Sequence, residues 1–237
     1  MPHNWRKSER HFEINGKNIT LKNLILINGK YGEGGALHIN SKSKCNLINV
    51  KISGNEGSKG GGVYTEGELV CKDCMFSHNE AKNYGGAIYI AGKGSCEIIN
   101  TKFIQNEARE DNGGAIYTKG NLNIKNSLFT HHYAKEDGGA ICAKGHVNVE
   151  NSTFTLNKAT GARVFLSEGG AIYCASINCK NSTFKENYAS QRGGAIHINN
   201  KGLSVIENSK FIDNEACQKG GAINIDDTSA HVVIKNN

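Results

Sequence analysis

Several common features of protein sequences are scarce in this chain. Proline occurs once among 237 residues, whereas glycine occurs 29 times, as expected of a chain built mostly of paired strands and tight turns. No run of apolar residues at helical spacing is longer than one turn, so helices are not expected. No stretch approaches 18 apolar residues, so the sequence predicts no membrane-spanning helix.

Blocks of like charge are also missing. The formal net charge is +6, but Lys, Asp and Glu are mixed along the chain. This pattern is typical of a solvated surface, and no nucleic-acid-reading motif accompanies the charge, so a nucleic-acid partner is not expected. Residues 1–11 form a polar segment without the apolar region of a signal peptide.

The sequence does contain a repeat. A glycine pair followed by a small residue and an aliphatic one occurs eight times, with successive copies starting 24 to 31 residues apart. The copies are residues 34–37, 60–63, 85–88, 113–116, 138–141, 169–172, 193–196 and 220–223. A period of this size indicates stacked units, in which function lies on faces and in loops.

A second motif, Phe-x-x-Asn, recurs in register with the glycine pairs. It occupies residues 76–79, 103–106, 154–157, 184–187 and 211–214, while Ile52 replaces the Phe and His132 the Asn in two further copies. Alternating apolar residues precede each Phe and follow each glycine pair. Alternation at period two indicates short strands.

Short strands at equal spacing predict an all-β fold, a single parallel β-helix of about eight coils over residues 12–237. A propeller blade would need a longer repeat, and the leucine-rich pattern is absent. Equivalent residues of adjacent coils should lie about 4.8 Å apart and form columns. Columns of Ile should fill the core, and Asn residues such as Asn126 and Asn151 should hydrogen-bond along the axis. Because the chain stops inside a repeat, we expect the coil to be cut there and the parent protein to be longer.

One column suggests a binding surface. The residue after each aliphatic position should face outward, and the candidate ladder consists of His38, Tyr64, Tyr89, Tyr117, Tyr173 and His197. A flat aromatic ladder could stack on glycans or contact a protein, although the simpler interpretation is that stacked side chains cover an exposed sheet. A longer turn over residues 160–168 adds Arg163 and Phe165 as candidate binding residues.

The cysteine, histidine and acidic residues do not suggest a disulfide framework, a metal site or a catalytic site. Cys45, Cys71, Cys96 and Cys179 fall at inward positions, so buried thiols are favoured over disulfides. Cys74 is expected to face outward, opposite Cys71, so Cys71-x-x-Cys74 makes a poor zinc site. The pair at 131–132 is expected in a surface turn, and acids near the glycine pairs could at most contact calcium weakly. We therefore expect no metal site, no cofactor and no catalytic constellation.

The combination of Gly-Gly-Ala-Ile/Leu/Val with Phe-x-x-Asn resembles the repeat of the chlamydial polymorphic outer membrane proteins, over about residues 15 to 235. This resemblance implies a right-handed parallel β-helix in a surface-displayed or secreted passenger that mediates adhesion. Gly62, Ile52 and His132 depart from the pattern.

The resemblance implies a non-catalytic, adhesin-like segment that binds a host or neighbouring-cell protein or glycan through a lateral face. Two alternatives remain open. Polysaccharide lyases and hydrolases also use right-handed β-helices, but would need carboxylates or basic residues converging from neighbouring coils. The segment could also be a structural spacer.

Overall fold

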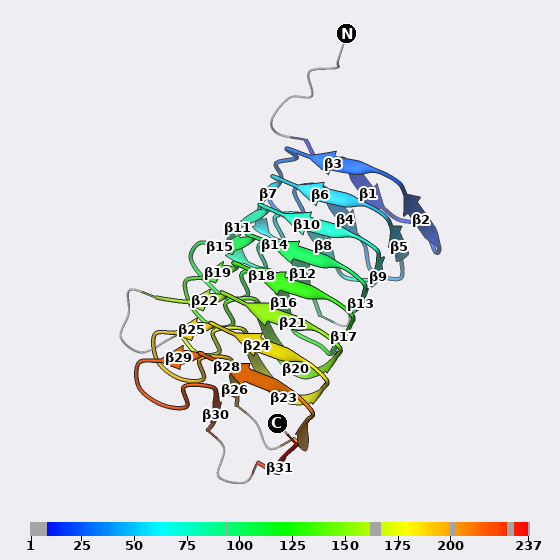
Figure 1. Ribbon diagram of the computed structural model, residues 1–237. Helices are drawn as coiled ribbons and strands as arrows, with labels where there is room; N and C mark the ends of the chain where they lie inside the picture. Colours follow the sequence, from blue (N-terminus) through cyan, green and yellow to red (C-terminus); the bar gives the residue numbers. More distant parts are fainter. Residues whose placement is uncertain (1–8, 93, 162–166, 200–201, 227–229, 237) are drawn as a thin grey trace.

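The chain folds into a parallel β-solenoid whose coils stack along one axis (Figure 1). This computed structural model describes residues 9–92, 94–161, 167–199, 202–226 and 230–236. The predicted all-β architecture of about eight coils is confirmed. In the described part of the chain, no helix is long and apolar enough to cross a membrane.

A complete coil contains four strands. The first series follows the glycine pairs: β1 (Phe12–Ile14), β4 (Leu37–Ile39), β8 (Val63–Thr65), β12 (Ile88–Ile90), β16 (Ile116–Thr118), β26 (Ile196–Ile198) and β30 (Ile223–Ile225). The second series is β2 (Ile19–Lys22), β5 (Lys44–Ile48), β9 (Glu68–Lys72), β13 (Ser95–Ile99), β17 (Leu122–Lys125), β27 (Ser204–Glu207) and β31 (Val232–Lys235). Two long strands, β20 (Ile141–Glu150) and β23 (Ile172–Lys180), run through both series.

The third and fourth series complete each coil. The third carries the Phe positions: β3 (Ile25–Ile27), β6 (Lys51–Ser53), β10 (Met75–Ser77), β14 (Lys102–Ile104), β18 (Leu128–Thr130), β21 (Thr153–Thr155), β24 (Thr183–Lys185) and β28 (Lys210–Ile212). The fourth is short: β7 (Glu56–Lys59), β11 (Glu80–Tyr84), β15 (Glu107–Ala108), β19 (Tyr133–Ala134), β22 (Lys158–Ala159), β25 (Tyr188–Ala189) and β29 (Glu215–Ala216).

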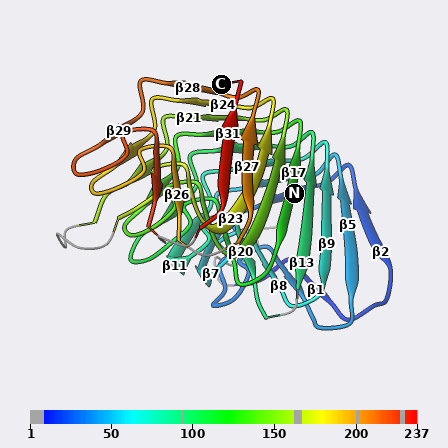
Figure 2. The ribbon, with the colours of Figure 1, turned by 90° about the horizontal axis from the view of Figure 1, so that it is seen from below.

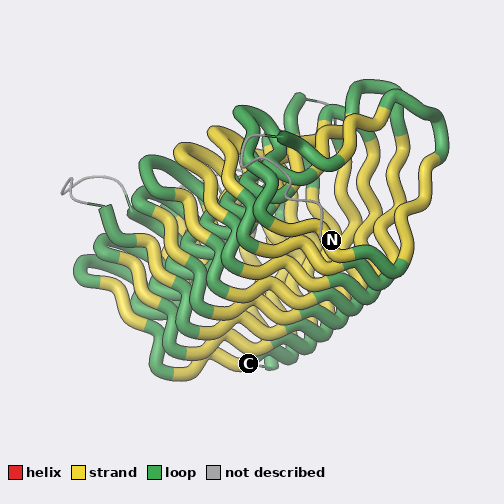
Figure 3. Tube along the Cα trace, turned by 90° about the horizontal axis from the view of Figure 1, so that it is seen from above, coloured by secondary structure: helices red, strands yellow, loops and turns green. Residues whose placement is uncertain are grey.

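Every described strand pair is parallel, and like residues face like residues. β20 and β23 join the first two series into one sheet, while the third and fourth series form separate sheets. Phe76 pairs with Phe103, and Ile88 pairs with Ile116. Figures 2 and 3 show the resulting rows of strands along the solenoid.

The corners between strands use left-handed backbone. In one coil these corner residues are Gly138, Asn151 and Leu156, with φ of 67°, 49° and 57°. Glycine and asparagine tolerate this region better than other residues, which explains the recurring Asn before each third strand. At this corner Asn49 donates to Asn23 and Asn100 to Asp73, but the continuous axial ladder lies elsewhere.

The second glycine of each pair is required for a different reason. A Cβ on Gly139 would lie 2.1 Å from the carbonyl oxygen of Gly170 in the next coil and 2.6 Å from the backbone of Lys158. The glycine pair therefore provides one left-handed turn residue and one point where backbones of neighbouring coils come into close contact.

The core is a set of stacked columns. The Phe rings of the third series lie face to face, with centroids 4.6 to 5.0 Å apart and planes within 6° of parallel. Ile, Leu, Val and Cys from the first two series pack against this stack. Burying this apolar surface is the main force that holds the coils together.

A buried amide ladder runs beside the Phe stack, built from the Asn of Phe-x-x-Asn. Asn79 is fully buried; its Oδ1 accepts from the backbone and side-chain nitrogens of Asn55, at 3.1 and 2.9 Å. Its Nδ2 donates to the Ile52 carbonyl and to Asn106. Four of these amides pair with both neighbouring coils: Asn55, Asn79, Asn157 and Asn187.

His132 replaces one member of this ladder. It is 1% exposed, not a surface residue as expected; its Nδ1 accepts from the Asn106 backbone and its backbone donates to Asn157. Among the described residues its Nε2 makes no hydrogen bond. Burial lowers the pKa of His132 to about 3.

The cysteines are free thiols, and all except Cys217 are buried. The outward placement expected for Cys74 is wrong. It is 4% exposed, and its Sγ donates to the backbone carbonyls of Leu47 and Lys72. It belongs to a column of small hydroxyl and thiol residues that close the corner between the second and third strands: Cys74, Thr101, Ser127, Ser152, Ser182 and Ser209.

Replacing Gly139 by Ala should destabilise the protein by about 1–3 kcal/mol, because the added Cβ overlaps backbone that cannot move independently. Gly120→Ala is the matched control: there the nearest atom to the added Cβ lies 3.5 Å away. Urea unfolding of both variants measures the difference. Equal stabilities would contradict the close-contact role of Gly139.

His132→Asn should restore the uniform amide ladder and remove a pH-dependent loss of stability. In the unfolded chain the pKa is near 6.5, whereas in the folded state it is about 3. The unfolded state therefore binds the extra proton, and stability falls by about 1.4 kcal/mol per pH unit as pH drops from 6.5 toward 3. Thermal melts across this range should show a shallower decline for His132→Asn than for wild type. His131→Asn, a change at the exposed neighbouring residue, should keep the wild-type slope.

Candidate functional site

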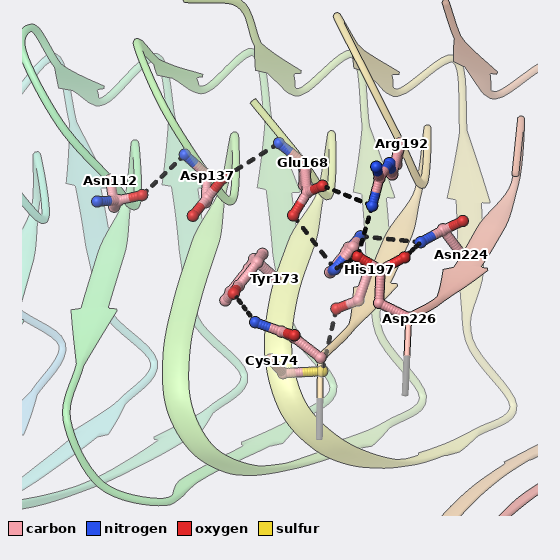
Figure 4. Close-up of polar contacts among 10 residues, drawn as sticks. Asn112, Asp137, Glu168, Tyr173, Cys174, Arg192, His197, Asn224 and Asp226 are labelled. Carbon is pink, nitrogen blue, oxygen red and sulfur yellow. Dashed lines mark hydrogen bonds and ion pairs between the residues drawn. The ribbon is translucent and has the colours of Figure 1, made fainter. Parts of the chain in front are cut away.

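One polar cluster outside the core breaks the repeat. It contains Glu168, Arg192, His197 and Asp226, which come from three successive coils (Figure 4). Glu168 and Arg192 each precede a glycine pair and face each other in an isolated parallel bridge. His197 lies in the middle of β26, and Asp226 directly follows β30.

The cluster is tightly packed around one imidazole. His197 Nε2 lies 3.2 Å from Glu168 Oε2 and 3.6 Å from Asp226 Oδ2. The Arg192 guanidinium lies 2.7 Å from Asp226 Oδ2 and 3.7 Å from Glu168 Oε1. The His197 side chain is fully buried, whereas those of Glu168 and Asp226 keep 17% and 32% of their surface exposed. The two carboxylates therefore reach solvent and the imidazole does not.

The two carboxylates have opposite electrostatic environments. Burial, together with the charges of Asp137 and Asp226, raises the pKa of Glu168 to about 7. Burial alone would also raise the pKa of Asp226, but its hydrogen bond from Asn224 and its contacts with His197 and Arg192 together lower it. Near neutral pH, Glu168 is poised to hold a proton while Asp226 stays ionised.

His197 is held as a neutral imidazole. Its burial lowers its pKa to about 4, although Asp226 opposes this effect. Its ring stacks on Tyr173 with centroids 5.1 Å apart. Asn224 Nδ2 lies 3.3 Å from Nδ1 and also donates to Asp226 Oδ1. In the described part of the chain, Nε2 has no hydrogen-bond partner despite its burial.

A chain of side-chain-to-backbone hydrogen bonds leads to the cluster along the solenoid. Asn112 Oδ1 accepts from the Asp137 backbone, and Asp137 Oδ1 accepts from the Glu168 backbone (Figure 4). Burial raises the pKa of Asp137, with Lys144 and the Glu168 amide opposing. These contacts fix the backbone that presents Glu168.

The predicted ladder forms, but it is not an exposed face. Tyr64, Tyr89 and Tyr117 stack with ring centroids 5.2 Å apart, yet Tyr64, Tyr89, Tyr117 and Tyr173 are only 5 to 7% exposed. His197 is fully buried and His38 is half-buried.

Side chains from other strand positions cover the rings of this ladder. Tyr84 packs against Tyr89 and Tyr117, Lys59 lies over Tyr89, and Lys144 lies over Tyr173. The expectation of an open aromatic surface is therefore wrong, and His197 is the ladder member that enters the polar cluster. The loop candidates Arg163 and Phe165 lie outside the described residues.

The expectation that no acid and base groups converge is also wrong. The residue before each glycine pair forms its own column: Glu33, Lys59, Tyr84, Asn112, Asp137, Glu168, Arg192 and Lys219. This column lies beside the ladder that contains His197. Comparing three positions across the repeats would have indicated the cluster: the residue before each glycine pair, the ladder residue and the residue after each first strand. These positions include Glu168, Arg192 and Asp226. Glu168, His197 and Asp226 also bring potential metal-ligand atoms within 4.8 Å of one another.

A groove of about 650 Å³ lies on the face formed by the second strand series. Its centre is a row of outward amides, Asn123, Asn148 and Asn178, linked by hydrogen bonds of 2.8 and 3.3 Å between coils. Beside it runs a row that alternates in charge: Lys125, Glu150, Lys180 and Glu207. No aromatic residue is among the described residues that line this groove.

Comparison with known proteins identifies the architecture. Residues 71–237, more than half of the chain, match the family described as "Right handed beta helix region". No curated protein and no solved structure matched the chain. The match agrees with the parallel coils, the stacked Phe column and the glycine-pair turns, so the chain belongs to the right-handed β-helix family.

Proposed function

We propose that this chain is a non-catalytic, adhesin-like segment of a surface-displayed or secreted protein, and that it binds a glycan along the groove of the second strand series. The observation that carries the proposal is the row of amides from Asn123, Asn148 and Asn178. Amides both donate and accept hydrogen bonds, so they suit the hydroxyl groups of a sugar polymer.

The charges beside the amide row support an uncharged or mixed-charge polymer. Lys125 and Glu150 approach to 3.5 Å, and Glu207 contacts both Lys180 and Lys235. Because opposite charges alternate from coil to coil, the row has no strong field of one sign that would select a polyanion. Binding would depend on local hydrogen bonds, with the charged groups offering further donors and acceptors.

The repeat spacing favours an extended ligand. Neighbouring coils are about 4.8 Å apart, so a polymer lying parallel to the axis meets an amide on three successive coils, from Asn123, Asn148 and Asn178. Each contact is weak, and affinity grows with the number of coils engaged. A glycan on a host or neighbouring cell has this repetitive chemistry.

Asn148→Ala and Asn178→Ala should each weaken glycan binding about tenfold, since each removes hydrogen bonds at the centre of the groove. The combined variant should lose binding on glycan arrays and in calorimetry with the best oligosaccharide. Asn46→Ala is the matched control, because Asn46 occupies the same outward row but lies beyond the groove-lining residues. Wild-type protein that binds no glycan would overturn the proposal and favour a structural spacer.

A polysaccharide hydrolase is the second candidate. Glu168 and Asp226 are paired carboxylates in environments that raise the pKa of one and lower the pKa of the other, as in a general acid beside an ionised partner. We rank this function lower because His197 and Arg192 each contact both carboxylates.

If the protein is a hydrolase, wild type should release reducing ends from polysaccharides, and Glu168→Gln and Asp226→Asn should each lower that rate at least about 100-fold. Glu66→Gln, at an exposed turn outside the cluster, serves as the control. Release by wild type that neither cluster variant reduces would exclude this site as its origin.

A further inference from the structure

We propose that Glu168, His197 and Asp226 form a binding site for a divalent transition-metal ion, with Zn²⁺ the best match. One imidazole nitrogen and two carboxylates are a ligand set that Zn²⁺ uses. Ca²⁺ and Mg²⁺ prefer all-oxygen sites. This inference is independent of glycan binding, because none of the three residues lines the groove.

The distances fit a tetrahedral ion. Two ligands at about 2.0–2.2 Å from Zn²⁺ and at the tetrahedral angle are about 3.4 Å from each other. His197 Nε2 lies 3.2 Å from the nearest Glu168 oxygen and 3.6 Å from the nearest Asp226 oxygen. One ligand atom from each of the three residues lies within 4.8 Å of the other two. Small side-chain rotations of the carboxylates would complete the geometry.

The second, independent observation is the imidazole itself. His197 is fully buried, and Nε2 points at both carboxylates without a hydrogen bond to any described residue. A buried polar atom without a hydrogen-bond partner destabilises the folded protein. When the single proton of the neutral ring is on Nδ1, Nε2 has a free lone pair. A bound ion would accept this lone pair and give Nε2 a partner.

Asn224 is positioned to set this tautomer. Its amide lies 3.3 Å from Nδ1, the position from which a neighbouring group orients a metal-bound imidazole. If the Asn224 amide turned its oxygen toward Nδ1, that oxygen would accept a hydrogen bond from Nδ1–H. The lone pair of Nε2 would then be free to bind the ion. The hydrogen bond from Asn224 to Asp226 would then be exchanged for coordination of Asp226.

Arg192 acts as the competing cation. Its guanidinium contacts both carboxylates in the absence of an ion, at 2.7 and 3.7 Å. Its Nε is buried without a hydrogen bond to a described residue, so its fit to the site is incomplete. Zn²⁺ carries twice its charge and could replace it between the carboxylates. Removing the arginine charge should therefore strengthen Zn²⁺ binding. If Zn²⁺ bound elsewhere on the surface, a substitution of Arg192 would not change its affinity.

The experiment is calorimetric titration of the whole chain with Zn²⁺ alone, and with Ca²⁺ alone. All proteins carry Cys217→Ser, which removes the exposed thiol, a competing ligand. We expect Zn²⁺ to bind one site and raise the melting temperature, and Ca²⁺ to have no effect. Glu168→Gln and Asp226→Asn should each weaken Zn²⁺ binding at least about tenfold, His197→Asn should abolish it, and Arg192→Gln should strengthen it about tenfold.

Controls separate this site from other ligands and from unfolding. His146→Gln changes a part-exposed histidine outside the cluster and should leave Zn²⁺ binding unchanged. Should His197→Asn fail to fold, the partly exposed Glu168→Gln and Asp226→Asn still test the site. Zn²⁺ binding that is unaffected by these two variants, or absent from both wild type and Arg192→Gln, would overturn the proposal. Glycan binding by the wild-type protein is measured separately in a metal-free buffer, so that a failure of glycan binding is distinguished from a failure of Zn²⁺ binding.

Discussion

The buried amide ladder is the constraint on which the rest of the structure depends. Ladder residues such as Asn79 bond to the coil before and the coil after, in a position where an unpaired amide would be costly. A coil shifted by one residue would bury an apolar or charged side chain in that place. The ladder therefore fixes the register between neighbouring coils. That register aligns the Phe stack and the glycine pairs, and with them the columns of outward residues.

Because the inward columns are so strictly determined, variation is confined to outward positions. Polar groups become neighbours there only by recurring near the same position in successive coils. The amide row of the groove and the cluster around His197 both arise in this way, the first from similar residues and the second from dissimilar ones. Both features span several coils, so their residues are close in space although they are far apart in the sequence.

Much of this architecture could be predicted by aligning the repeats. The Phe-x-x-Asn and glycine-pair positions indicated the stacked coils, and alternation placed Ile and most Cys residues inward. Side-chain alternation could not show what lies above an outward residue, which is why Tyr89 and Tyr117 were expected to be exposed although Tyr84 covers them. Cys74 and His132 were misplaced because corners do not follow strand alternation. The cluster was missed because its members occupy different columns, and their proximity depends on turn geometry.

The substitution at His132 has a consequence for how the solenoid comes apart. Stability in a stacked array is approximately a sum of terms for each coil and each interface between neighbours. A ladder with one imidazole among amides has one weaker junction: Nδ1 of His132 accepts from the preceding coil, but Nε2 makes no hydrogen bond to a described residue. Mechanical or chemical stress should therefore divide the array there into two blocks that melt separately, and the polar cluster and most of the groove-lining residues belong to the carboxy-terminal block.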